Sequence, residues 1–452
     1  MKKINDSYDK WQALAARVGG ECTNAMRDYY ERIYSKELPE WFAGLYDTEI
    51  GGFYFSNSAR DNDRLIYEGE TFGLLPDADS TWQAFVTMVS MGMTGGKHYR
   101  DVIPEWMQKK TVAFLKGLQD PDGYFYHPQF GRKRNEEKAN RRSRDTGRAL
   151  AVIKAFGAMP TYDSPMGDIG DGILADGTPA AKPVSKAREE APATEKKTAM
   201  ALFMKDADTF REYLDTLTLR NNSYSTGSFF ITQSSELKYR DRQLAESGAG
   251  YSLFGILTDW LTEHQLENGI WDDVKNYAGT SGIMKICRLY SMAGVMLPNA
   301  EKTVRAAIYS ITSDEEAKSV TDVFNPWVAT SVIISDLRKI GGEAGAEIAR
   351  RITDELIENA PRLIRATADK LVRFKRADGA YSYPVNASGG YNMGMPLGIK
   401  GIDEGDMNAT HLVMGAVSNI YTAMDIADIA VAPYGEDDMQ RFLDIVENKR
   451  KG

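Results

Sequence analysis

The sequence predicts an all-α protein in which six helical hairpins close a ring, an (α/α)6 toroid with short β-hairpin-like turns at one end. Two observations carry this prediction: a Gly flanked by an acid or Asn leads into aromatic residues five times along the chain, and a helical stretch rich in small residues follows each copy. An internal repeat of this kind is typical of stacked supersecondary units. The copies are DTEIGGFYF (47–55), QDPDGYFYHP (119–128), ENGIWDDV (267–274), a degenerate FNPW (324–327) and RADGAYSYP (376–384).

The segments before the turns predict outer helices. Residues 104–119 place Trp106 and Leu115 on one apolar face at helical spacing, and 250–266 and 347–375 are likewise polar on one side and apolar on the other. The segments after the turns are apolar nearly all round, which is typical of buried helices. We expect these inner helices at 80–93, 146–158, 280–294, 326–339 and 408–424.

The sixth hairpin is less regular. Residues 200–219 suggest an outer helix, SYSTGSFFITQ after them suggests an extended segment, and a short inner segment follows. Residues 161–198 are rich in Gly, Pro, Ala and charge, which predicts a long surface loop or lid. Because the repeat continues on both sides of this loop, we expect residues 1–452 to form a single domain.

Composition excludes several function classes. A net charge of −9 and a pI near 5.3 argue against a nucleic-acid binder. No stretch approaches the length of a membrane span or of a signal-peptide core, so we expect a cytoplasmic protein without a membrane partner. Cys22 and Cys287 are far apart and suit buried thiols. No cysteine-rich zinc site or nucleotide-binding loop is present, and we expect no metal and no cofactor.

The alternation of outer helix, Gly-aromatic turn and buried inner helix resembles the (α/α)6-toroid carbohydrate enzymes, which include glycoside hydrolases, polysaccharide lyases and sugar epimerases. QDPDGYFYHP also resembles the repeat of terpenoid cyclases, although the Asp-rich motifs of those enzymes are absent. The resemblance extends over most of residues 23–425 and implies a toroid that acts on an oligosaccharide.

Glycoside hydrolysis requires two carboxyl groups, one protonated and one ionised. Asp79 and Asp145 each precede a strong inner-helix pattern and are our candidate pair, with helix capping as the alternative role for both. Aromatic, acidic and amide side chains in the turns and at the inner-helix starts suit the apolar faces and polar edges of sugars, although the aromatic residues could instead only pack the turns. The expected substrate-binding residues are Tyr126, Trp271, Asp272, Asn276, Tyr383, Asp406 and Asn408.

A uronate lyase would use other groups, and His127 and Tyr277 are the candidates for proton transfer. His411 could face either the core or the pocket. The run at 131–148 carries eight basic and three acidic side chains. It could be a solvated face, or Arg141, Arg142 or Arg144 could bind a sugar carboxylate or sulfate.

The sequence therefore predicts a glycoside hydrolase for an acidic oligosaccharide. A uronate lyase, a sugar epimerase and a non-catalytic sugar-binding toroid remain as alternatives. The oligomeric state is left open.

Overall fold

The computed structural model describes residues 2–67, 69–130, 134, 139–181 and 201–452. The described chain is mostly helical, which confirms the all-α prediction, and its two sheets are antiparallel pairs of short strands. The strand pairs are β1 (Arg64–Tyr67) with β2 (Glu70–Gly73) and β3 (Tyr391–Asn392) with β4 (Met395–Pro396). None of the helices in these ranges is both long and apolar enough to cross a membrane.

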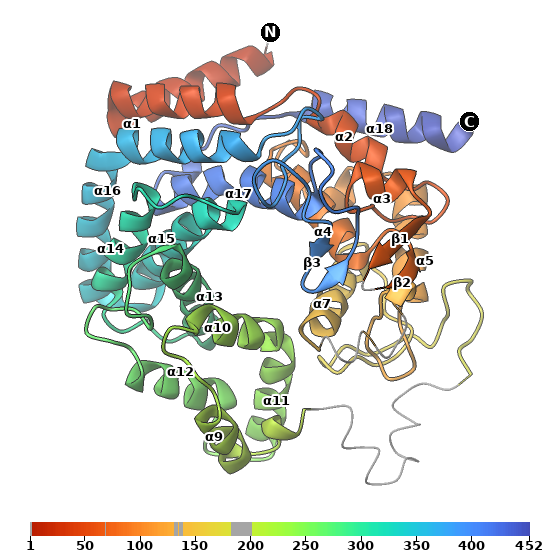
Figure 1. Ribbon diagram of the computed structural model, residues 1–452, viewed down its shortest axis with the longest axis horizontal. Coiled ribbons are helices and arrows are strands. Elements are labelled where there is room, and N and C mark those ends of the chain that lie inside the picture. The colour runs from red at the N-terminus through yellow and green to blue at the C-terminus, as the bar shows by residue number, and fades with distance from the viewer. Residues whose placement is uncertain (1, 68, 131–133, 135–138, 182–200) are drawn as a thin grey trace.

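Six helices pack against one another in a closed cycle around the centre of the molecule (Figure 1). We call this cycle the inner ring. Each member contacts the next, and the last returns to the first. Five of the six coincide with predicted inner segments, and most of their ends agree to within a few residues. The exceptions are α7 and α15, which begin earlier than predicted. In order, the members are α4 (Ala78–Ser90), α7 (Ala139–Ala155), α10 (Ser223–Thr232), α13 (Tyr277–Ala293), α15 (Val320–Ile340) and α17 (Met407–Ala423).

A second set of helices packs around the inner ring (Figure 1). Three of the four predicted outer segments correspond to α5 (Glu105–Gly117), α12 (Leu253–Glu263) and α16 (Gly342–Leu371), and the fourth, 200–219, is helical over the shorter α9 (Ala207–Asp215). The other α-helices are α1 (Lys2–Ile33), α2 (Leu38–Leu45), α3 (Asn57–Asp61), α11 (Ser234–Glu246), α14 (Ala300–Ile311) and α18 (Glu436–Lys451). Short 3-10 turns are η1 (Tyr99–Asp101), η2 (Pro128–Phe130), η3 (Leu202–Met204), η4 (Val372–Phe374) and η5 (Ala427–Ile429).

Four of the predicted turns share one backbone feature, a glycine with a positive φ angle, which a side chain would strain. These glycines are Gly51, Gly123, Gly269 and Gly379. In three of the turns an aromatic residue donates its backbone N–H to a threonine hydroxyl on the next inner helix. The pairs are Phe53 with Thr81, Phe125 with Thr146, and Tyr381 with Thr410. The repeat therefore docks each of these turns onto the helix that follows it.

Two of the predicted elements are wrong. FNPW is not a turn: it lies inside α15, because Ser319 and Asp322 form a capping box that starts the helix at Val320. The segment predicted to be extended is the inner helix α10. Its Thr, Phe and Ile residues favour strands, but a glycine allows close helix packing instead, since a Cβ at Gly227 would lie 2.6 Å from the Cβ of Lys285 on α13.

The first part of the predicted loop at 161–198 lies against the ring. The carboxylate of Asp171 accepts from Lys116 on α5 at 2.9 Å, and that of Asp168 accepts from Lys154 on α7 at 2.7 Å. Residues 182–198 lie outside the described residues.

Candidate functional site

Three carboxylates surround one guanidinium group between α4 and α7, and we call these four residues the carboxylate cluster. Arg141 Nη2 lies 2.9 Å from Asp77 Oδ1, its Nε lies 2.9 Å from Asp145 Oδ2, and its Nη1 lies 3.9 Å from Asp79 Oδ2. All four side chains are buried, with at most 3% exposure. Buried charges persist only when they are paired in this way, so the cluster is a built feature of the fold.

Local structure explains how the cluster forms. Asp77 is the N-cap of α4, where its Oδ1 accepts from the Ser80 N–H, and Asp79 lies in the first turn, where the helix end favours negative charge. Arg141 and Asp145 are four residues apart on one face of α7. The expected capping role of Asp79 and Asp145 is therefore wrong: Asp77 caps α4, and α7 begins before Asp145.

The cluster shifts the pKa values of Asp79 and Asp145 in opposite directions. Burial opposes the charged form of Asp79, but Arg144, Arg141 and Arg148 together hold the pKa of this carboxyl well below its usual range. Burial and the neighbouring carboxylates of Asp77 and Asp79 outweigh Arg141 at Asp145 and raise its pKa to about 7. Two neighbouring carboxyl groups whose pKa values are pushed apart are typical of an acid and base pair.

A segment far away in the sequence completes the surroundings of Asp79. Its Oδ2 accepts from Arg144 Nε at 2.8 Å and from the amide of Asn392 on β3 at 2.9 Å. The backbone oxygen of Asn392 in turn accepts from Arg141 at 3.3 Å. Arg148 Nε lies 3.5 Å from Asp79 Oδ1. The hairpin β3–β4 thus contributes one wall beside the cluster.

Arg144 and Arg148, which contact Asp79, belong with two further cationic side chains, Lys285 and Arg288, and we call these four the cationic quartet. The first two come from α7 and the last two from α13, which α10 separates in the inner ring. They are nevertheless close enough to act on one another: burial, followed by Arg144, Arg288 and Arg148, lowers the pKa of Lys285 to about 7. Side chains from helices that are not neighbours can meet in this way across the centre of the ring.

The quartet is incompletely neutralised. Asp79 pairs with Arg144 and Arg148, whose side chains remain 20% and 29% exposed. Lys285 and Arg288 are half-buried, and neither has an ion pair among the described residues. A concentration of positive charge that is open to solvent favours an anionic ligand.

Aromatic and amide groups border the quartet. The guanidinium of Arg148 stacks over Trp82 at 3.4 Å, and Lys285 lies 5.4 Å from the ring centroid of Tyr224, a residue that is 40% exposed. From α17, His411 bonds with the Thr87 hydroxyl at 2.8 Å, and burial and the arginines lower its pKa to about 3. Neutral imidazole, aromatic faces and amides beside cations suit a sugar with a charged group.

Four of the predicted site residues come together here. Asp79, Asp145 and Arg144 are in direct contact with the cluster or belong to it. Asn408, half-buried at the start of α17, accepts from Gln83 of α4 at 2.9 Å.

Other predicted residues contact different parts of the protein. His127 is 1% exposed, and burial and Arg141 lower its pKa well below the usual range. The hydroxyl of Tyr277 accepts from Lys370 of the outer helix α16. The indole of Trp271 is fully buried and donates to the backbone oxygen of Leu261 at 2.7 Å. In this structure all three residues pack elements together.

The remaining predicted residues hold turns and helix ends. Asn276 caps α13, and Asp406 caps α17. Burial raises the pKa of Asp406 to about 7 although it accepts from backbone N–H groups, one of them that of Tyr383. The other contacts are Tyr126 to Asp122, Arg142 stacked on Tyr124, Asp272 to Ser223, and the Tyr383 hydroxyl to Thr321.

Sequence reasoning missed Arg148, Lys285, Arg288 and Asn392. A signal existed for the two residues of α13, because Lys285 and Arg288 are three apart in a helix that is otherwise apolar, and a charge there needs a reason to be buried. Arg148 ends the recognised basic run. Asn392 lies on the two-residue strand β3, in a segment without a periodic sequence pattern, and nothing in the sequence connects it to Asp79.

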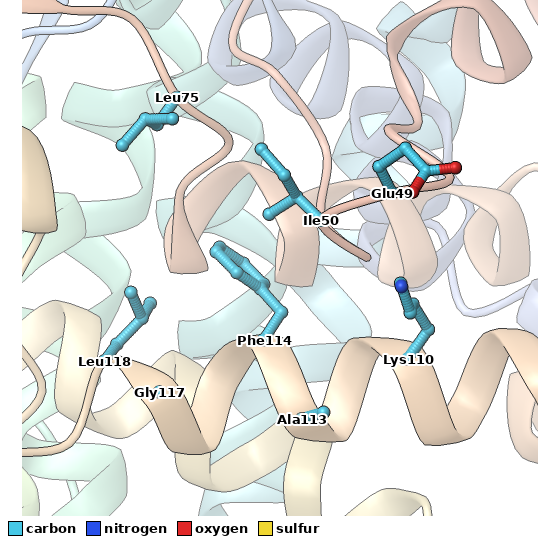
Figure 2. A pocket seen from close by; sticks show the side chains of 8 residues that line it. All are labelled: Glu49, Ile50, Leu75, Lys110, Ala113, Phe114, Gly117 and Leu118. Carbon is cyan, nitrogen blue, oxygen red and sulfur yellow. The ribbon is translucent and has the colours of Figure 1, made fainter. Parts of the chain in front are cut away.

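The hollow in Figure 2, of about 430 Å3, lies between the first Gly-aromatic turn and α5. Its walls are mostly apolar, with Glu49 and Lys110 as the charged residues that line it. It contains no member of the carboxylate cluster or the cationic quartet, so we do not assign the site there. Within the described ranges, no group of three or more His, Cys, Asp or Glu side chains is placed to hold a metal ion.

Comparison with known proteins leaves the assignment to the chemistry of the site: no family model matches the chain, and no curated protein matches it.

Proposed function

We propose that this chain is an (α/α)6 toroid that hydrolyses an acidic oligosaccharide at the centre of its inner ring. The closed cycle of six inner helices with outer helices around it supports the toroid. The exposed aromatic ring of Tyr224, the amides and the excess of positive charge support an acidic sugar as the ligand. The two cysteines, both buried and unpaired, suit a cytoplasmic location.

The observation that carries the proposal is the contrast between Asp79 and Asp145. Asp145 retains a proton near neutral pH and serves as the general acid for the leaving glycosidic oxygen. Its Oδ1 is buried and has no hydrogen-bond partner among the described residues, so this oxygen is unpaired and a substrate that reached the cluster would supply its partner. Asp79 is ionised and serves as the base for water or as the nucleophile.

A second reaction, β-elimination from a uronate, is favoured by Lys285. An amine with a pKa of about 7 is matched to removing a proton at neutral pH. The guanidinium groups beside it would neutralise the substrate carboxylate and so make the neighbouring C–H more acidic. In this reaction Lys285 replaces the expected His127 and Tyr277.

A panel of oligouronates, sulfated oligosaccharides and neutral oligosaccharides tests the proposal, with products identified by mass spectrometry and ultraviolet absorbance. Hydrolysis adds one water per bond cleaved and creates no absorbance, whereas elimination adds no water and creates an absorbing C=C bond. We expect water addition, with turnover lowered by about a hundredfold or more in Asp79→Asn and in Asp145→Asn.

The matched control is Asp273→Asn, because Asp273 is an exposed acid paired with Arg220 on the outside of the site. Its turnover should equal that of the wild type. Binding of the acidic sugar without any cleavage would contradict the proposal and would favour a non-catalytic sugar-binding protein. An absorbing product would favour elimination.

A further inference from the structure

The structure assigns a second role within the site: Lys285 and Arg288, together with Arg144 and Arg148, bind the oxyanion group of the sugar and select acidic over neutral substrates. This inference deepens the proposed function and rests on it for the identity of the ligand as a sugar. It centres on Lys285 and Arg288 of α13, which α10 separates from α7 in the inner ring.

The two α13 cations occupy unusual positions. Lys285 and Arg288 are one helical turn apart on α13, a helix whose buried residues are mostly apolar. Placing two charges there costs solvation free energy that no carboxylate offsets, because among the described residues neither side chain has an ion pair. A bound anion would supply the missing partner.

Positive charge exceeds negative charge in the quartet. The carboxylate of Asp79 pairs with two of the four cations, Arg144 and Arg148. Arg144 and Arg148 are held on Asp79 by their Nε atoms, at 2.8 and 3.5 Å. Their Nη groups remain as donors, and a carboxylate or sulfate accepts two parallel bonds from such a fork.

An exposed aromatic side chain lies beside the cations. Tyr224 lies at the start of α10, is 40% exposed, and has its ring 5.4 Å from Lys285 Nζ. The apolar face of a sugar ring could stack on this side chain while the acidic group reaches Lys285 and Arg288. The juxtaposition therefore fits a sugar acid better than an isolated inorganic anion.

Equilibrium binding tests the inference without any need for turnover. Calorimetry would compare D-glucuronate and D-glucose 6-sulfate, two oxyanion probes, with D-glucose as the neutral probe, on the wild type and on Lys285→Met and Arg288→Met. We expect the oxyanion probes to bind and glucose to bind at least tenfold more weakly, with each substitution lowering oxyanion affinity about tenfold or more. The matched control, Lys275→Met, changes an exposed lysine and should have no effect.

A pH series separates direct contact from a structural role. The groups that face Lys285 are Arg144 and Arg148 of α7, Tyr224 of α10 and Arg288 of α13, and of these the lysine titrates near neutrality. Oxyanion affinity should fall as the pH rises above about 7 in the wild type and should stay level in Lys285→Arg, which also keeps the fold intact.

Equal affinity for glucuronate and glucose, or unchanged affinity in folded Lys285→Met and Arg288→Met, would overturn the inference. Its failure is distinguishable from failure of the proposed function. If hydrolysis is wrong but the oxyanion site is right, the probes still bind and Asp79→Asn alters no turnover. If the site is wrong but hydrolysis is right, oligosaccharides are cleaved without preference for acidic ones.

Discussion

Arg141 lies buried among three carboxylates, and replacing it with methionine measures how strongly the fold depends on the carboxylate cluster. The substitution keeps an unbranched side chain but removes the charge that contacts Asp77 and Asp145 at 2.9 Å each and Asp79 at 3.9 Å. None of these carboxylates has more than 3% of its side chain exposed, so water cannot replace the guanidinium. Removing one partner of a buried ion pair costs about 3–5 kcal/mol, and we expect a loss of free energy of unfolding in this range.

The loss should depend on pH in a defined direction. The pKa of Asp145 is raised in the folded protein, from 3.8 to about 7. This group therefore contributes stability that is fully present below its unfolded value and is lost as the pH rises through about 7. Without Arg141, charging Asp145 and Asp77 becomes costlier still. The variant should consequently lose most stability above about pH 7 and least near pH 4, where the carboxyls accept protons.

Urea unfolding followed by circular dichroism at several pH values provides the assay. The control is Arg373→Met, which removes an arginine from the exposed pair with Glu316 and should cost about 1 kcal/mol or less. If Arg141→Met loses no more than this control, or if its loss is independent of pH, the cluster does not hold the charges that we describe.

Three further predictions follow from single residues. Gly123→Ala should destabilise the protein by about 3 kcal/mol in the same urea assay, because φ is +88° and a Cβ would lie 2.1 Å from a backbone oxygen. The control is Gly172→Ala, which also has a positive φ but lies in open space and should cost about 1 kcal/mol. Lys285→Met should raise the free energy of unfolding near pH 7 by up to about 5 kcal/mol. The folded pKa of this lysine is lowered from 10.5 to about 7, so wild-type stability falls as the pH falls through that window. The advantage of the variant should therefore vanish above about pH 10.5. Asn392→Ala removes a hydrogen-bond donor to Asp79 and should lower kcat/KM on the acidic substrate about tenfold. Unchanged turnover in the folded variant would refute the role of Asn392 in positioning Asp79.

Much of the helical framework could be predicted because its signals are local. The Gly-aromatic turn needs a positive φ and an aromatic residue at fixed spacing, and the inner helices are apolar all round. The prediction failed where a local signal was overridden. Strand-favouring residues in α10 form a helix because Gly227 lets the helix approach α13 closely. FNPW resembles a turn, but the capping box before it had already started α15.

The candidate site could be predicted only in part. Asp79 and Asp145 can be predicted because each lies near a helical pattern on a repeat unit, but Arg141, and not the helix ends, brings them together. His127 and Trp271 share the turn pattern, yet both side chains are buried. Asn392 could not be found, because a contact across more than 300 residues leaves no local trace.

The measurement that tests the central claim most directly is cleavage of an oligouronate in isotopically labelled water by the wild type and by Asp145→Asn. Hydrolysis at the carboxylate cluster predicts that the wild type incorporates the label into the newly formed reducing end. In Asp145→Asn the rate of incorporation should be lower by about a hundredfold or more. An unlabelled product, or equal rates in the two proteins, would contradict the account.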